Sequence, residues 1–307
     1  MKASVEKQTQ LPKHVHLTEV GLREGLQIEK QILPTKSKVD LIMALAGARL
    51  PAIQVAAFVH PAKMPQMADA EAVIARLPGD GNAQYSALTL NLHGVERACR
   101  TSIPWIEVSL SVDEPHSLRN SGMTVAEARQ EMIAMVALAK RNGRKVRATI
   151  QCAFGYAGPQ DISVEKVREM AVFLLDQGVD LLLPADTTGT ATPQTIDQVL
   201  NALLPLMGQT PMGLHLHDTR GLGLVNVMTA LRLGISHFDS SLGGVGGCPF
   251  VSGAAGNIAT EDTLHLLQSM GIETGIDGAQ VAACSQRLSA ILGHPLPGKI
   301  YQLVPLI

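Results

Sequence analysis

Short runs of apolar and β-branched residues alternate with longer amphipathic stretches about eight times along the chain. A strand followed by a helix takes roughly 30 residues, and each repeat has about that length. The predicted strands cover residues 15–20, 52–57, 84–90, 105–110, 145–150, 180–184, 212–217 and 237–241. Helical periodicity predicts helices in the stretches between them, among them residues 124–140, 163–177 and 193–206.

The number of repeats predicts the fold class. Eight strand-helix units match an α/β fold of the (β/α)8 TIM-barrel type, although a doubly wound open sheet would show the same alternation. Thr192 followed by Pro193 is typical of a helix start, and Ser163 opens another periodic run. Because no linker-like segment divides residues 1–307, we expect one domain, with the barrel over about 15–270 and an additional C-terminal helix at 278–293 within a helical extension over about 271–307.

Composition supports this class and excludes several others. The chain of 307 residues is 46% hydrophobic and only 3% aromatic, which is typical of buried parallel strands and helices. Its formal net charge of -2 gives no electrostatic reason to expect nucleic acid. No apolar run reaches the roughly 20 residues that a membrane span needs, and the first residues do not resemble a targeting peptide, so we expect a cytoplasmic protein without a membrane partner.

The cysteines are not arranged as a disulfide framework or a zinc site. Cys99, Cys152, Cys248 and Cys284 have wide, irregular spacings and form no C-x-x-C pair. We expect Cys99, Cys152 and Cys284 to pack in the core, whereas Cys248 lies between Gly247 and Pro249 in a Gly-rich segment. A thiol there could donate or accept a proton above a site, but the residue alone slightly favours a purely structural role.

Polar residues collect where the predicted strands end, which is where a TIM barrel places its active site. His215 and His217 project on the same side of a strand, because side chains alternate along it, and could bind one metal ion. Alternatively, the two histidines could be buried in the barrel interior with hydrogen-bond partners and bind no metal, and their spacing in the sequence would be the same. The position of the pair at a strand end, followed by Asp218, favours metal binding.

Oxygen-bearing neighbours indicate the kind of metal. Two imidazoles without an obligatory thiolate fit Mg2+ or Mn2+ better than a structural zinc. Glu24, in the segment after the first strand, and Asn257, in the Gly-rich segment after the eighth, could complete the site. Alternatively, Glu24 could form a solvated ion pair and Asn257 could make a turn.

Two further residues could take part in chemistry. Arg23 is a permanent cation beside the predicted metal site and could stabilise a developing enolate, unless it pairs on the surface with Glu19 or Glu24. Asp186 follows the sixth strand and could be a base or support a ligand, although a helix-capping role is nearly as plausible.

These segments resemble the motifs of the hydroxymethylglutaryl-CoA lyase family across most of the chain and in the same order. The matching segments are residues 19–27 (EVGLREGLQ), 186–189 (DTTG), 215–219 (HLHDT), 243–250 (GGVGGCPF) and 253–262 (GAAGNIATED). The histidine pair and the first-strand Arg-acid pair are shared with isopropylmalate-synthase-like relatives, whereas the cysteine segment with the asparagine segment after it is specific to the lyases.

The resemblance implies a TIM barrel with Mg2+ or Mn2+ bound by four residues and an acyl-CoA substrate. It implies that Arg23 steadies the thioester enolate, that Cys248 is the acid/base, and that Asp186 supports catalysis. Residues expected at the substrate are Arg23, Gln27, Gln54 and Glu261, and the implied metal ligands are Glu24, His215, His217 and Asn257.

The chain departs from the family pattern after the first strand and along the second. Glu24 stands where the family has Asp, so its carboxylate is one methylene further from the backbone. Gln54 stands where the family has Glu, and the Thr, Thr and Ser that follow in the family are Val55, Ala56 and Ala57 here. Lost hydrogen-bonding groups select against polar substrate atoms, so we expect an acyl group other than hydroxymethylglutaryl.

The leading hypothesis is therefore a metal-dependent lyase that splits a 3-hydroxy-3-substituted acyl-CoA into acetyl-CoA and a keto acid or ketone. A condensing enzyme or aldolase acting on a 2-oxo acid is the second hypothesis. The third is a non-catalytic acyl-CoA-binding barrel, and a metal-dependent hydrolase comes last because its histidine pair usually follows the first strand. Closed symmetry is common among oligomers, so we expect a homodimer or a higher homo-oligomer.

Overall fold

The computed structural model describes residues 11–79, 81, 83–161, 163–246 and 256–303. Its eight strands are all parallel and hydrogen-bond in the order β6-β5-β4-β3-β2-β1-β8-β7. They are β1 (His16–Glu19), β2 (Ala52–Phe58), β3 (Gln84–Thr89), β4 (Trp105–Ser111), β5 (Lys145–Gln151), β6 (Leu181–Pro184), β7 (Leu214–His215) and β8 (His237–Ser240).

The strands form a nearly closed barrel, as predicted, and not an open doubly wound sheet. β1 pairs with β2 on one side and with β8 on the other, so the first and last strands are neighbours. Single bridges from Leu182 to Met212 and from Ala185 to His215 bring β6 beside β7. The closure places the carboxyl ends of all eight strands around one mouth.

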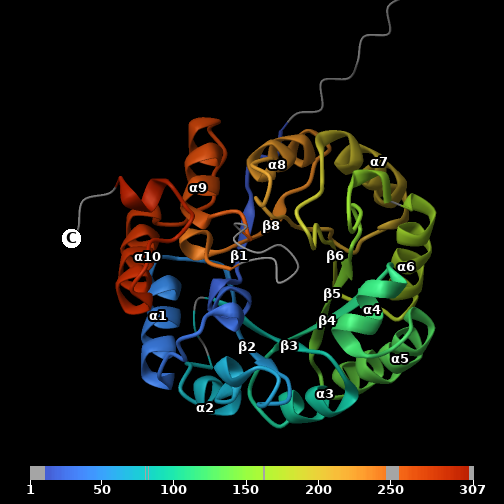
Figure 1. Cartoon of the computed structure of the whole chain (residues 1–307), viewed down its shortest axis with the longest axis horizontal. Coiled ribbons are helices and arrows are strands. Elements are labelled where there is room, and N and C mark those ends of the chain that lie inside the picture. The colour runs from blue at the N-terminus through green and yellow to red at the C-terminus, as the bar shows by residue number, and fades with distance from the viewer. Residues whose placement is uncertain (1–10, 80, 82, 162, 247–255, 304–307) are drawn as a thin grey trace, which may run out of the picture.

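Helices surround the strands, as Figure 1 shows in a view along the barrel. None of the helices in the described part of the chain is long and apolar enough to cross a membrane. They are α1 (Thr35–Gly47), α2 (Ala70–Ile74), α3 (Leu92–Cys99), α4 (Glu114–Ser121), α5 (Val125–Arg141), α6 (Val164–Asp176), α7 (Pro193–Leu203), α8 (Gly223–Arg232), α9 (Thr260–Ser269) and α10 (Gly278–Leu292).

Local sequence signals account for several helix boundaries. The Thr192 side chain accepts a hydrogen bond from the Thr195 backbone N–H at the start of α7, and Pro193 is the first helical residue. Ser163 occupies the N-cap position of α6 but makes no side-chain capping bond. α10 is the additional C-terminal helix predicted at 278–293, and its C-cap residue is Gly293, whose φ of 75° is unfavourable for other residues.

Candidate active site

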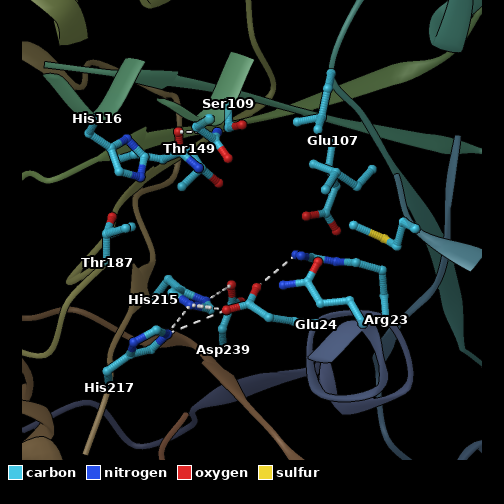
Figure 2. Close-up of a pocket in the computed structure, with 17 residues that line it drawn as sticks. Arg23, Glu24, Glu107, Ser109, His116, Thr149, Thr187, His215, His217 and Asp239 are labelled. Atoms are coloured by element: carbon cyan, nitrogen blue, oxygen red, sulfur yellow. Dashed lines mark hydrogen bonds and ion pairs between the residues drawn. The ribbon is translucent and has the colours of Figure 1, made fainter. Parts of the chain in front are cut away.

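A pocket opens at the carboxyl ends of the strands. The lining residues come from all eight strands or the segments that follow them: Arg23, Glu24, Gln27, Met64, Leu88, Leu90, Glu107, Ser109, His116, Asn120, Thr149, Gln151, Ala185, Thr187, His215, His217 and Asp239. Figure 2 shows two facing sides, with Glu24, His215 and His217 on one and Ser109, Thr149 and His116 on the other.

Glu24, His215 and His217 meet at one point of the pocket wall. Glu24 Oε1 lies 3.0 Å from His215 Nε2 and 3.4 Å from His217 Nε2. The two imidazole Nε2 atoms are 3.1 Å apart. Glu24 lies in a single π-helical turn, η1 (Gly21–Gly25), which directly follows β1 and turns its carboxylate towards the histidines. The three side chains form the candidate metal cluster of the described residues.

The surroundings of His215 prepare it to bind a cation. Its Nδ1 lies 3.0 Å from Asp239 Oδ2, and a hydrogen bond donated there leaves the Nε2 lone pair directed at the cluster. Burial alone would lower the pKa of His215, but Glu24 and Asp239 raise it to about 10. Burial would likewise raise the pKa of Glu24, yet His215 and Arg23 hold it well below its usual value. Positive charge is therefore favoured here, whether from a proton or a metal ion.

Asn257 also fits the predicted set of ligands. Its backbone forms an antiparallel bridge with His217, and its Nδ2 donates to the Val245 carbonyl at 3.3 Å. The Asn257 Oδ1 atom is buried and has no hydrogen-bond partner. A buried amide oxygen without a partner is costly, and a bound ion would satisfy it. The donors are two imidazole nitrogens and two oxygens, a set suited to a divalent cation.

Arg23 lies beside this cluster and is buried, not paired on the surface. Its Nη2 atom is 2.8 Å from Glu24 Oε2, and its Nε donates to Gln54 Oε1. The alternative partner considered for it, Glu19, is fully buried and instead accepts from the backbone N–H groups of Gly21 and Leu242. The guanidinium is thus held in one orientation at the pocket wall.

Other predicted residues take different places. Gln27 lines the pocket, whereas Gln54 is fully buried behind Arg23 and is not among the lining residues. Glu261 accepts from the Gly243 N–H at 2.9 Å and from the Ser285 hydroxyl, so its described contacts are within the protein. Cys248 lies outside the described residues.

Asp186 is buried at the end of β6, and burial raises its pKa. Its Oδ1 accepts from the backbone N–H groups of Thr190 and Ala191, which organises the turn before α7. The next residue, Thr187, lines the pocket. Gly189 in this turn has a φ of 65°, and a Cβ there would come within 2.4 Å of the Thr219 side chain, which explains the glycine.

Three charged residues of the site were not predicted from the sequence: Glu107 on β4, Arg147 on β5 and Asp239 on β8. Arg147 lies between the two carboxylates, 3.7 Å from Glu107 Oε2 and in direct contact with Asp239 Oδ1. All three are almost fully buried. The available signal was a charged residue within an otherwise apolar predicted strand, since a buried charge needs a partner or a function.

Replacing Asp239 with Asn should weaken metal binding. The amide cannot hold the His215 Nδ1–H as a carboxylate does, and such changes typically cost about 10- to 100-fold in metal affinity. It also removes one charge partner of buried Arg147, which should destabilise the fold by about 3 kcal/mol or more. Mn2+ calorimetry and denaturant unfolding would measure the two effects, with the exposed Asp176→Asn as the matched control. Unchanged Mn2+ affinity would contradict the role given to Asp239.

The buried acid Glu261 predicts a pH-dependent stability. Burial raises its pKa to about 7 from an ordinary value of 4.5, so the folded state retains a proton that the unfolded chain releases. This contribution to stability is complete below about pH 4.5 and is lost as the pH rises towards 7. Glu261→Gln, which cannot ionise, should therefore lose less stability between about pH 5 and about pH 8, by on the order of 3 kcal/mol. Denaturant unfolding across that range tests this, with Glu165→Gln as control, and parallel curves would refute it.

The chain is similar to known proteins over most of its length. The profile of the HMGL-like family matches residues 14–288. The chain is 35% identical over 285 residues to a mitochondrial hydroxymethylglutaryl-CoA lyase of Arabidopsis thaliana, covering 93% of this chain and 61% of that protein. It is 34% identical over 301 residues to an (R)-citramalyl-CoA lyase of Chloroflexus aurantiacus, covering 95% of each.

Solved structures agree with these matches. The crystal structure of a Bacillus subtilis HMG-CoA lyase superposes with a TM-score of 0.91 at 34% identity, covering 95% of this chain and 98% of that one. An Acinetobacter baumannii HMG-CoA lyase, solved in complex with coenzyme A and 3-methylmalate, superposes with a TM-score of 0.89 at 34% identity, covering 94% and 95%.

Proposed function

Because this chain belongs to the HMGL-like family, we propose that its pocket binds a coenzyme A thioester with a hydroxyl group on C3 and cleaves the bond between C2 and C3. The protein is a carbon-carbon lyase of the HMG-CoA lyase type. The observation that carries the proposal is the Glu24, His215 and His217 cluster, with the Arg23 guanidinium beside it in the same pocket.

We propose Mg2+ or Mn2+ as the cofactor, held by Glu24, His215, His217 and Asn257. Two carboxylate or amide oxygens with two imidazoles suit these ions, and the buried Asn257 Oδ1 without a partner supports its inclusion. When bound, such an ion acts as a Lewis acid that lowers the pKa of a substrate hydroxyl.

The residues of the chain account for the rest of the cleavage. The C3 hydroxyl gives its proton to water in the open pocket, a carbonyl forms at C3, and the electron pair of the C2–C3 bond passes to the thioester as an enolate. Arg23 donates hydrogen bonds from the pocket wall, where the growing negative charge of the thioester oxygen would be stabilised. The enolate then takes up a proton at C2 and becomes acetyl-CoA.

We propose Cys248 as the acid that delivers this last proton, on the resemblance of its segment alone. Asp186 is proposed to support catalysis by positioning, since its hydrogen bonds hold the turn that presents Thr187 to the pocket. Glu261 is likewise proposed as a supporting residue, because it accepts a hydrogen bond from the Gly243 backbone N–H. Gln27 is the predicted substrate contact that lines the pocket directly.

The acyl group is proposed to carry a less polar C3 substituent than hydroxymethylglutaryl. Met64, Leu88 and Leu90 give the pocket an apolar stretch after β2 and along β3. Residues 55–57 of β2 offer no hydroxyl group and are buried. A polar substituent that lies against this apolar stretch finds no hydrogen-bond partner there, which disfavours it.

A panel of thioesters tests the function. The purified protein with Mn2+ would be incubated with hydroxymethylglutaryl-CoA, citramalyl-CoA and analogues with longer alkyl groups on C3, and acetyl-CoA release would be followed. We expect release, fastest with an alkyl analogue. Condensation of acetyl-CoA with a 2-oxo acid but no cleavage would favour the aldolase-like alternative, and tight thioester binding without turnover would favour a binding protein.

We further propose that the protein is cytoplasmic and forms a homodimer or a higher homo-oligomer, since closed symmetric assemblies are common. Light scattering of the purified chain tests the assembly, and a mass of about one chain would refute it. Fractionation of cells expressing the tagged protein tests the location.

A further inference from the structure

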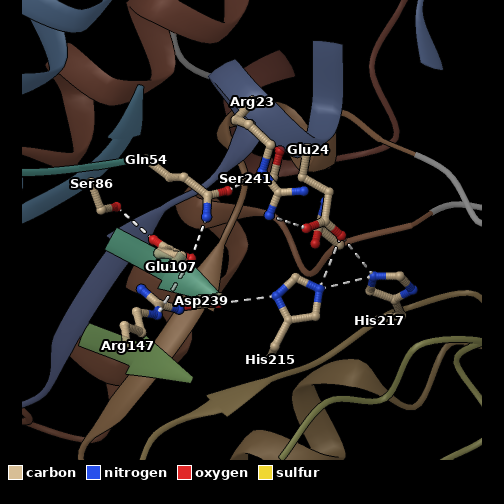
Figure 3. Close-up of polar contacts among 12 residues, drawn as sticks. Arg23, Glu24, Gln54, Ser86, Glu107, Arg147, His215, His217, Asp239 and Ser241 are labelled. Carbon is tan, nitrogen blue, oxygen red and sulfur yellow. Dashed lines mark hydrogen bonds and ion pairs between the residues drawn. The ribbon is translucent and has the colours of Figure 1, made fainter. Parts of the chain in front are cut away.

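Seven side chains around the pocket form a closed ring of hydrogen bonds and ion pairs, drawn in Figure 3. Each member contacts the next, and the ring passes through the barrel interior from one strand to another. In order, its members are Arg23, Glu24, His215, Asp239, Arg147, Glu107 and Gln54, which returns to Arg23. The ring thus links the proposed oxyanion-stabilising group to a proposed metal ligand by two routes.

Glu107 is a member of this ring to which the proposed mechanism gives no role. It lines the pocket, and 3% of its surface is exposed. The Ser86 hydroxyl donates to Glu107 Oε1 at 2.5 Å, and the Gln54 amide Nε2 donates to Glu107 Oε2. Arg147 Nε lies 3.7 Å from the same Oε2 atom. A buried carboxylate with these partners is held in one position.

Glu107 determines which way round the Gln54 amide lies. Gln54 Oε1 accepts from Arg23 Nε, while Gln54 Nε2 donates to Glu107. A side-chain amide can accept on one side and donate on the other in this way, whereas an ionised carboxylate can only accept. A carboxylate at position 54 would place two negative charges in hydrogen-bond contact, so the Gln that departs from the family pattern complements Glu107.

The second route from Glu107 leads to the metal ligands. Arg147 lies between Glu107 and Asp239, and Asp239 Oδ2 lies 3.0 Å from His215 Nδ1. The positive charge of Arg147 keeps Asp239 in place, and Asp239 orients the imidazole. A displacement of Glu107 would therefore change the orientation of Arg23 on one side and of His215 on the other.

We propose that Glu107 is a positioning residue for the lyase reaction, and that Gln54 and Glu107 form a matched amide-carboxylate pair that fixes the Arg23 guanidinium. The effect of this pair on the reaction rests on the proposed function, whereas the contacts of Gln54 with Glu107 and Arg23 do not depend on the substrate. Arg23 donates hydrogen bonds to the thioester oxygen, and Glu107 determines the orientation of the guanidinium that donates them.

Exchange of the two groups tests the pairing. Gln54→Glu alone sets two carboxylates against each other, and the shift of Arg23 should lower kcat by about 100-fold with little change in KM. Glu107→Gln alone is isosteric and should lower kcat by about 10-fold, because a charged acceptor is lost. The double variant restores one amide and one carboxylate, so we expect its kcat to return to within about 5-fold of the native value.

Two controls separate positioning from folding. Glu165→Gln makes the same chemical change at an exposed site and should leave every readout unchanged. In a background of Arg23→Lys, the exchange variants should lower kcat by less than about 3-fold, because the group that they position is already absent. Thermal unfolding of each variant shows whether it is folded.

Mn2+ titration by calorimetry gives a readout without substrate. Gln54→Glu should weaken Mn2+ binding by about 10-fold through Arg23 and Glu24, and the double variant should recover it. A folded double variant no better than Gln54→Glu in Mn2+ affinity would overturn the inference, as would native Mn2+ affinity in both single variants. If the native protein cleaves no thioester in the panel, the proposed function fails, while the Mn2+ pattern still decides the pairing.

Discussion

His217→Ala should lower kcat by on the order of 1000-fold or more. A metal ion contributes several kcal/mol of charge stabilisation to such reactions, and each 1.36 kcal/mol corresponds to a factor of about ten in rate. The change removes one of the three clustered ligand atoms, whose Nε2 lies 3.1 Å from that of His215. Turnover of the best thioester and Mn2+ calorimetry measure the two consequences together.

The exposed histidine of α9, His265, offers a matched control, and His265→Ala should retain native turnover and Mn2+ affinity. Because His217 lies at the pocket wall and not in the packed core, we expect the variant to unfold close to the native temperature. A folded His217→Ala protein with turnover within about tenfold of native at the same Mn2+ concentration would contradict the proposed metal centre.

Arg23→Lys should lower kcat by about 100- to 1000-fold, the usual loss when a donor to a developing oxyanion is removed. The native guanidinium contacts Gln54 through Nε and Glu24 through Nη2 at the same time. A lysine ammonium keeps the charge but cannot reproduce this fork, so the substitution tests direction separately from charge. KM should change little, since the lost interaction develops mainly in the transition state.

Steady-state kinetics of Arg23→Lys would be compared with Arg168→Lys, the same change at an exposed site on α6. We expect native kinetics for the control. An effect confined to KM would mean that Arg23 binds the ground state of the substrate, and a native kcat would exclude its proposed role.

The elements of the barrel were largely predictable because each leaves a local signal. Apolar runs predicted all eight strands, and the Thr192–Pro193 pair predicted the start of α7. Periodicity also predicted the additional helix α10. Periodicity overestimated β7, whose continuous ladder covers only Leu214–His215 with isolated bridges at Met212 and His217, because the ladder depends on the neighbouring strands and not on the strand's own residues.

Part of the candidate site was predictable for a similar reason. His215 and His217 are two residues apart in an extended segment, so their common direction follows from backbone geometry alone. Glu24 follows the first strand, and closure of the sheet brings that strand beside β8. The prediction that these three residues meet therefore needed only the fold, and the structure places their ligand atoms within 4.8 Å of one another.

Sequence by itself determined the class of fold, the family and the donor groups that can bind a cation, because all three depend on residue type and spacing along the chain. Tertiary structure alone decided the partners of Gln54, Glu107, Arg147 and Asp239, which come from four different strands. A buried charge must find a partner, but hydrogen bonds are short and directional, so the partner is chosen by how side chains face one another across the closed barrel. That geometry turns Gln54 from an apparent loss of a carboxylate into the complement of Glu107.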